Sequence, residues 1–192
     1  MFQEIYDALS RIDLKCWISI YLIGFAVKCL DDIIDDEIDF NVTKKIIPYI
    51  ILISVIAVFI NSEMAFSLFL ASYCIGMFTE PYIKLPTGIY SYQETILIIL
   101  LLGYLGGIKI GLWALSIIMV LHLADDLIDY KRDKKLSRKN LVITYGKVEI
   151  ITVLLIFLII ALMIDYQKVF IVLILAPLVE KNYVYVLRRI ND

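Results

Sequence analysis

Two acidic stretches contain the side chains best suited to chemistry. Residues 30–39 read LDDIIDDEID and residues 124–133 read ADDLIDYKRD. In each stretch three aspartates follow the spacing i, i+3, i+7, which places their carboxylates on one face of a helix. These are Asp32, Asp35 and Asp39 in the first stretch and Asp126, Asp129 and Asp133 in the second. Because like charges at this spacing repel, the pattern predicts a bound cation, and Mg²⁺ suits carboxylate oxygens.

The two stretches repeat one another at an offset of 94 residues. Lys28 precedes Asp32 by one helical turn, and His122, the single histidine of the sequence, precedes Asp126 in the same way. A helical bundle with such a repeat would bring the two acidic ends face to face around one cavity. His122 is then a candidate to accept a proton during a reaction. A histidine packed in the interior is an equally good interpretation.

Hydropathy predicts the elements that position these residues. The chain has 192 residues, of which 61% are hydrophobic, and its mean hydropathy is +0.87. Since soluble domains are about half apolar, we expect an all-α, multi-pass transmembrane bundle forming a single domain over residues 1–192. The pattern of residues 1–13 is typical of an amphipathic helix at a membrane surface. Seven predicted spanning segments follow at residues 15–31, 45–61, 63–79, 93–108, 110–125, 148–165 and 167–187.

The basic residues predict the orientation in the membrane. With the aspartate-rich ends placed in the cytoplasm, 14 lysines and arginines lie on the inner side and 4 on the outer side. Positive residues favour the cytoplasmic side, so we expect a cell-membrane protein whose two acidic stretches face the cytoplasm. The two longest loops, residues 80–92 and 134–147, fall on the same side, where loops that carry function would meet the acidic ends.

A diphosphate is the ligand that this arrangement favours. Carboxylates alone repel it, whereas Mg²⁺ between them binds both and neutralises charge on a leaving diphosphate. Lys84 and Arg138 lie in the two long loops and could bind phosphate, although positive-inside topology alone also explains them. A site at the membrane suggests an isoprenoid tail, whose path aromatic side chains could line. The aromatic residues expected in the bundle interior are Tyr21, Phe25, Tyr73, Phe78, Tyr82 and Tyr104.

These motifs resemble those of the UbiA superfamily of intramembrane prenyltransferases. That family has an Asn-Asp-x-x-Asp-x-x-x-Asp stretch on one helix and an Asp-x-x-x-Asp stretch four helices later. Residues 31–39 resemble the first stretch, with Asp31 in place of the Asn, and Asp129 and Asp133 match the second. The segment 137–146 resembles the Gly-Arg-x-Thr-Leu region and the glycine that follows it. The family's Tyr-x-x-x-Lys loop is similar to Tyr82 and Lys84, at a shorter spacing.

The resemblance implies a fold, an activity and a set of site residues. The fold would be a ring of nine transmembrane helices, of which this sequence has about seven. The six aspartates would hold Mg²⁺ on a prenyl diphosphate, which ionises before an acceptor of unknown identity attacks it. The residues assigned on this basis are Asp32, Asp35, Asp129, Asp133 and His122 for catalysis, Asp31, Lys84 and Arg138 for the diphosphate, and Tyr21, Phe25 and Tyr82 for the tail.

Three other interpretations of the same residues remain open. A terpene cyclase on this scaffold would use the same aspartates and need no separate acceptor. A non-catalytic membrane protein that binds or transports divalent cations would also need paired carboxylates at helix ends. A shortened, inactive relative would act through its partners. In none of these cases do we expect a nucleic acid as partner.

Overall fold

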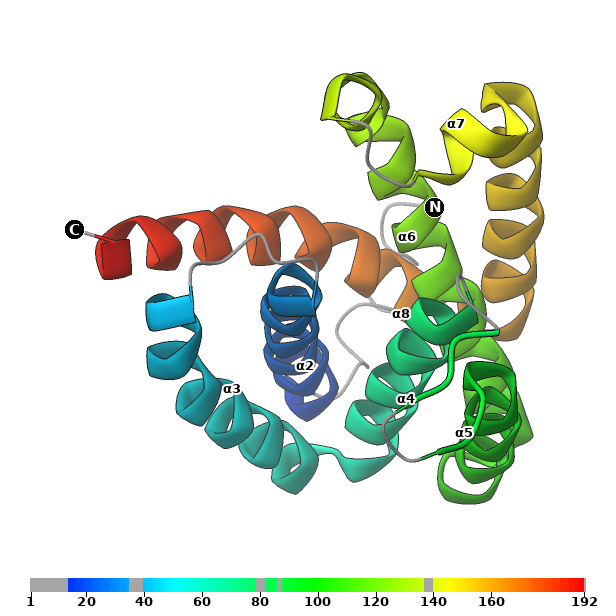
Figure 1. Ribbon diagram of the computed structural model, residues 1–192. Helices are drawn as coiled ribbons and strands as arrows, with labels where there is room; N and C mark the ends of the chain where they lie inside the picture. The colour runs from blue at the N-terminus through cyan, green and yellow to red at the C-terminus, as the bar shows by residue number, and fades with distance from the viewer. Residues whose placement is uncertain (1–13, 35–39, 79–81, 86–87, 137–139, 192) are drawn as a thin grey trace, which may run out of the picture.

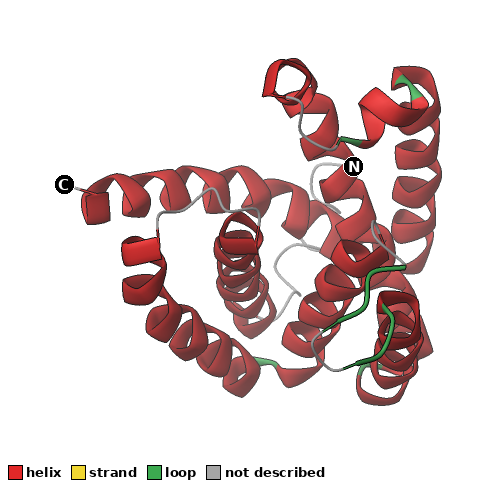
Figure 2. Cartoon of the chain, viewed as in Figure 1, coloured by secondary structure: helices red, strands yellow, loops and turns green. Residues whose placement is uncertain are grey.

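The computed structural model describes residues 14–34, 40–78, 82–85, 88–136 and 140–191, and its elements are helices (Figures 1 and 2). They are α2 (Leu14–Ile34), α3 (Phe40–Ile60), α4 (Ser62–Phe78), α5 (Ser91–Leu105), α6 (Gly107–Leu136), α7 (Leu141–Tyr145) and α8 (Lys147–Asn191). Within the described ranges no strand is present, and the backbones of Lys84 and Tyr90 form one isolated bridge. The all-α prediction is confirmed for these residues, whereas the predicted helix at residues 1–13 lies outside them.

The predicted apolar segments coincide with these helices. The first five correspond to α2, α3, α4, α5 and α6. The last two correspond to the two halves of α8, which is interrupted at Asp165, where the backbone leaves the helical region with φ −158° and ψ 88°. Figure 1 shows the consequence, because the chain of α8 descends beside α6 and then turns away toward the C-terminus. The helix α6 runs beyond the predicted apolar segment to Leu136 and so includes the whole second acidic stretch.

Three helical segments, α2, α6 and the second half of α8, run in the same direction. Near their N-terminal ends, Cys16 of α2 and Lys168 of α8 line one pocket. The Lys168 ammonium also lies 5.9 Å from the ring centroid of Trp113 in α6. At the opposite end, the hydroxyl of Tyr183 in α8 donates a hydrogen bond to Asp32 in α2. The acidic ends of α2 and α6 are therefore brought to the same end of the molecule.

The helix α3 runs antiparallel to α2 along its length. The Ser19 hydroxyl donates to the carbonyl oxygen of Ala57 at 3.0 Å, near the end of α3. Toward the start of α3, Ile46 and Ile50 pack in one hydrophobic cluster with Ala26 of α2. This pairing buries one apolar stripe of α3, while most of its remaining face stays exposed.

Tight corners connect the helices at the end where α2 begins. Asn61 separates α3 from α4, and its side-chain oxygen accepts the backbone N–H of Met64 at 3.1 Å, which caps α4. Gly107 begins α6 with φ 73°, a backbone region that glycine enters without the strain of a side chain. Asp165 caps the second half of α8 by accepting the backbone N–H of Lys168 at 3.2 Å.

In the described part of the chain, three helices are long and apolar enough to cross a bilayer. They cover Val42–Ile60, Gly107–Leu136 and Lys147–Leu187, and two shorter apolar helices cover Ser62–Met77 and Ser91–Leu105. Large hydrophobic side chains on these helices face outward, including Phe59 and Met163, which are 85% and 83% exposed. Such a surface suits lipid better than water. The fold therefore has the character of a membrane protein.

Candidate functional site

The acidic ends of α2 and α6 meet at Lys28. Its ammonium lies 3.1 Å from Oδ1 of Asp32, one turn further along α2. The same nitrogen lies 3.7 Å from Oδ2 of Asp125 in α6. One cation thus contacts a carboxylate from each acidic stretch. The two stretches were predicted to face one another, and this shared lysine brings carboxylates of both to one place.

The second half of α8 also contacts Asp32, in addition to the contacts made by α2 and α6 at Lys28. The phenol hydroxyl of Tyr183 donates a hydrogen bond to Oδ2 of Asp32, and both residues are buried. The Phe25 ring packs edge-on against the Tyr183 ring, with centroids 6.4 Å apart. Asp32 is therefore held on one oxygen by an ammonium and on the other by a phenol. A buried carboxylate needs such partners, because leaving it unpaired is costly.

Two more carboxylates belong to this cluster. Glu180, one turn before Tyr183 on α8, interacts electrostatically with Lys28, Asp32, Asp125 and Asp129. Asp129 also interacts with Lys28. It forms an ion pair with Arg132 of α6 at 2.9 Å. We call Lys28, Asp32, Asp125, Asp129 and Glu180 the acidic cluster. With Arg132 counted beside Asp129, four carboxylates face two cations, so an excess of negative charge remains that favours a further cation.

The other two aspartates of the second stretch have a different role. Oδ2 of Asp126 accepts the backbone N–H of Leu141 at 3.0 Å, at the start of α7. The side-chain amide of Asn140 donates to the backbone oxygen of Asp126 and to Oδ2 of Asp133, each at 2.8 Å. The Asn140 side-chain oxygen caps α7 by accepting the N–H of Val142 at 2.9 Å. The bonds from Asn140 and Leu141 to Asp126 and Asp133 hold the start of α7 against α6.

The structure also describes three other predicted site residues, His122, Asp31 and Lys84. His122 is half-buried, and its Nε2 is buried without a hydrogen-bond partner among the described residues. It interacts electrostatically with Asp126. Asp31 is exposed beside Asp32 on α2, and Lys84 is exposed in the loop between α4 and α5. Among the described residues, no ion pair links Lys84 to the acidic cluster. Asp35, Asp39 and Arg138 lie outside the described residues.

The predicted tail-binding aromatics do not form a single group. Tyr21 and Phe25 lie one turn apart on α2, half-buried and below Lys28 along the same helix. The Tyr21 hydroxyl accepts a hydrogen bond from the Asn182 side chain at 2.7 Å. Tyr82, in contrast, is 82% exposed, and its ring lies 6.4 Å from that of Tyr92. Of these three aromatic residues, Tyr21 and Phe25 therefore lie along α2 between its N-terminal end and the acidic cluster, whereas Tyr82 lies on the surface.

Four members of the site, Lys28, Asp125, Glu180 and Tyr183, were not predicted as site residues from the sequence. The i, i+3, i+7 spacing selects Asp126 and not its neighbour Asp125. Glu180 and Tyr183 lie far along the chain from both acidic stretches. A signal for Glu180 was present, since it is a single carboxylate in the apolar stretch between Val169 and Lys181. Ionisable residues in such helices usually have a functional partner.

The chemistry of the acidic cluster fits a magnesium ion. Within the described parts of the chain, no group of three acidic, histidine or cysteine side chains is close enough to hold a metal ion by itself. Mg²⁺ does not need such a group, because it takes one or two carboxylates and completes its coordination with water and substrate phosphates. Asp32 and Asp125, which already share a cation through Lys28, are the pair best placed to supply these oxygens.

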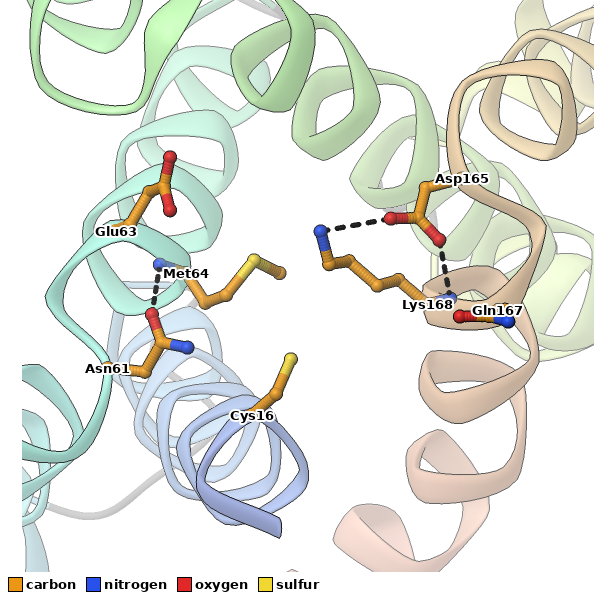
Figure 3. Close-up of a pocket in the computed structure, with 7 residues that line it drawn as sticks. All are labelled: Cys16, Asn61, Glu63, Met64, Asp165, Gln167 and Lys168. Atoms are coloured by element: carbon orange, nitrogen blue, oxygen red, sulfur yellow. Dashed lines mark hydrogen bonds and ion pairs between the residues drawn. The ribbon is translucent and has the colours of Figure 1, made fainter. Parts of the chain in front are cut away.

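A pocket of about 250 Å³ lies at the opposite end of the same helices (Figure 3). It is lined by Cys16, Asn61, Glu63, Met64, Asp165, Gln167 and Lys168. Figure 3 shows the Lys168 side chain reaching toward Asp165, with which its ammonium forms an ion pair at 3.0 Å. Two of the three charged side chains of the pocket are thus paired with one another. Asn61 and Asp165 also cap α4 and the second half of α8, so these two polar groups have a structural role in the pocket.

Comparisons with known proteins do not identify the chain. No protein-family model, no curated protein and no solved structure matches it. The function must therefore be inferred from the acidic cluster and the helices that form it.

Proposed function

We propose that this protein is a membrane prenyltransferase that binds an isoprenoid diphosphate through Mg²⁺ at the acidic cluster. One observation carries the proposal, namely that the Lys28 ammonium contacts both Asp32 of α2 and Asp125 of α6. Two carboxylate-rich helix ends that already share one cation can share another. The resemblance of the two aspartate stretches to those of the UbiA superfamily supports the same conclusion.

The chain's own residues would divide the work between holding and orienting. Asp32, Asp125 and Asp129 would supply carboxylate oxygens from two helices. Tyr183 fixes the orientation of Asp32 through its hydrogen bond. Mg²⁺, when bound there, neutralises the negative charge that develops on the leaving diphosphate. His122, whose Nε2 is buried, can accept a proton near Asp126.

The isoprenoid tail would extend from the acidic cluster along α2. Phe25 packs against Tyr183 at the cluster, and Tyr21 follows one turn nearer the N-terminus. Aromatic faces attract the allylic cation formed when the diphosphate leaves. In this proposal the helices cross the cell membrane about seven times and the acidic cluster faces the cytoplasm, as the distribution of lysines and arginines favours.

Diphosphate release is the direct test of the chemistry. Purified protein in detergent is incubated with geranyl, farnesyl or geranylgeranyl diphosphate, with and without Mg²⁺, and membrane extract supplies the acceptor. The proposal predicts release that requires Mg²⁺ and a prenylated product identified by its mass. A cyclic hydrocarbon formed without extract would instead indicate a terpene cyclase on the same site. Metal flux into vesicles without any diphosphate release would indicate a cation transporter.

A pair of matched variants connects the activity to the acidic cluster. Asp129→Asn removes a carboxylate from the cluster, whereas Asp165→Asn removes one at the opposite end and keeps the helix cap. We expect the first variant to lose at least about tenfold in rate, because one lost metal ligand or charge contact costs more than about 1.4 kcal/mol. The second should retain activity. Equal activity of the two variants, or no metal-dependent release from folded wild-type protein, would refute the proposal.

A further inference from the structure

A second role within the acidic cluster belongs to Lys28. Its ammonium lies between carboxylate oxygens of two helices, 3.1 Å from Asp32 and 3.7 Å from Asp125. It also interacts electrostatically with Glu180 of α8 and with Asp129 of α6. Lys28 therefore interacts with carboxylates from three helices, α2, α6 and α8. This is the position that a divalent cation bound by the same carboxylates would take.

Asp32 and Lys28 are largely buried, and this burial explains why the Asp32 carboxylate needs a positive partner even when no metal is bound. The Asp32 side chain is 11% exposed and that of Lys28 is 24% exposed. Without a positive partner, a carboxylate so buried would be left uncompensated beside other carboxylates, which strongly destabilises a fold. A protein whose site is not always filled with metal must therefore supply its own cation, and Lys28 does so from the same helix as Asp32.

The chemistry of lysine suits a partner that can leave. An ammonium is a compact charge on a flexible four-carbon stem, and it makes no fixed bidentate contact of the kind that arginine makes. The contact with Asp125 is long, and the Asp125 side chain is 54% exposed, so this half of the arrangement is open to exchange. Tyr183 holds Asp32 independently and would keep that carboxylate in place if Lys28 moved.

We propose that Lys28 is the resident cation of the acidic cluster, which holds α2 and α6 together before metal binds. On this view a divalent ion displaces the ammonium from Asp32 and Asp125 and frees it to pair with a phosphate oxygen of the substrate. The inference rests on the proposed function for the identity of that substrate. Its first half, the competition between lysine and metal, concerns only the chain and the ion.

The competition is tested by metal binding to variants of the purified protein in detergent. Mn²⁺ reports binding by its electron paramagnetic resonance signal and replaces Mg²⁺ at oxygen sites. Lys28→Met should bind Mn²⁺ about tenfold or more tightly than wild type, because it removes both a competitor and a positive charge beside the ion. Lys28→Arg keeps the charge and is harder to displace, so it should bind Mn²⁺ no more tightly than wild type. Lys45→Met, which removes an exposed lysine of α3, should bind as wild type does.

Thermal unfolding gives a second measurement on the same variants. Without divalent ions Lys28→Met should unfold at a lower temperature than wild type, and added Mg²⁺ should restore more stability to it than to wild type. Equal Mn²⁺ affinity of Lys28→Met and wild type, or an equal Mg²⁺ effect on their unfolding, would overturn the proposal.

A third measurement needs no variant and so does not depend on how the variants fold. Mass spectrometry of wild-type protein treated with a small amine-reactive reagent measures the reactivity of each lysine. Mg²⁺ alone should raise the reactivity of Lys28, and Mg²⁺ with inorganic pyrophosphate should lower it again, while Lys45 stays constant. No rise with Mg²⁺ would refute displacement, and a rise without the later fall would refute the phosphate contact.

These results are separable from those of the proposed function. If Mg²⁺ exposes Lys28 but the protein releases no diphosphate from any prenyl substrate, the proposal for Lys28 stands and the prenyltransferase proposal fails. If the protein releases diphosphate with Mg²⁺ but Lys28→Met binds Mn²⁺ no more tightly than wild type, the prenyltransferase proposal stands and the proposal for Lys28 fails.

Discussion

The Tyr183 hydroxyl donates a hydrogen bond to the Asp32 carboxylate and so connects α8 to α2 across 151 positions of the sequence. Both side chains are buried. The bond fixes one oxygen of Asp32, while the Lys28 ammonium contacts the other. A metal ligand works best when a second residue fixes its orientation, and Tyr183 is in the position to do this for Asp32.

Removal of the Tyr183 hydroxyl tests this connection. A hydrogen bond to a charged group contributes about 1.5–3 kcal/mol, so Tyr183→Phe should lower the unfolding temperature by several degrees in detergent. The ring and its edge-on packing with Phe25 would remain. Tyr185→Phe, an exposed tyrosine on the same helix, is the matched control and should unfold as wild type does. A Tyr183→Phe protein as stable as this control would contradict the assigned bond.

The junction of α6 and α7 provides a second prediction, at Asn140. This residue caps α7 and donates to both Asp126 and Asp133. Asn140→Ala should cost about 2–3 kcal/mol, since it removes the cap and leaves the buried Asp133 carboxylate without its amide donor. Hydrogen exchange measured by mass spectrometry should rise in α7 and in the last turns of α6.

The α2 segment that holds Lys28 and Asp32 is the internal control for that experiment. It makes no described hydrogen bond to Asn140, so its exchange should not change. Faster exchange in α2, with α7 still protected, would mean that Asp126 and Asp133 serve the acidic cluster rather than the capping of α7.

The corner between α5 and α6 gives a third prediction, which depends on the backbone alone. A Cβ at Gly107 or at Gly103 would meet no atom within 4 Å, but Gly107 has φ +73° and Gly103 is helical. Gly107→Ala should therefore destabilise the protein by about 1–2 kcal/mol. Gly103→Ala should stabilise it by about 0.5–1 kcal/mol. Thermal unfolding of the two variants checks both signs, and the same sign for both would contradict the assigned backbone.

The break in α8 gives a fourth prediction, at Asp165. Its carboxylate caps the following half of the helix and forms an ion pair with Lys168. Asp165→Ala removes both interactions and should cost about 1 kcal/mol or more, whereas Asp165→Asn keeps a good cap and should cost less. Unfolding of the two variants separates the contributions. Equal losses would show that the cap does not stabilise this turn.

The positions of the helices could be predicted from the sequence because they depend on local hydropathy. Segments such as 63–79 and 93–108 differ from α4 and α5 by three residues or fewer at each end. The break near Asp165 could also be predicted from hydropathy, because this charged residue separates two apolar segments. The seven membrane crossings stay a prediction, because three helices among the described residues are long and apolar enough to span a bilayer by themselves.

The composition of the acidic cluster could be predicted only in part. Asp32 and Asp129 were predicted as site residues; Asp32 contacts Lys28 in the structure, and Asp129 interacts with it electrostatically. Spacing on one helix cannot specify how far that helix rotates against its neighbour, and this rotation brings Asp125 rather than Asp126 to Lys28. The capping of α7 uses Asp126 and depends on a residue, Asn140, that lies beyond the helix. Glu180 stands out as a carboxylate in an apolar stretch, but its position beside Lys28, like that of Tyr183 beside Asp32, depends on long-range packing.

The central claim is that the acidic ends of α2 and α6 bind a diphosphate through a divalent cation. Equilibrium binding of an unreactive geranylgeranyl diphosphate analogue, in which the bridging oxygen is replaced, tests it without requiring turnover. We predict that wild-type protein binds this analogue only when Mg²⁺ is present, and that Asp32→Asn weakens the binding at least about tenfold while Asp165→Asn does not. Binding that is equally strong without Mg²⁺, or in the Asp32→Asn protein, would contradict the claim.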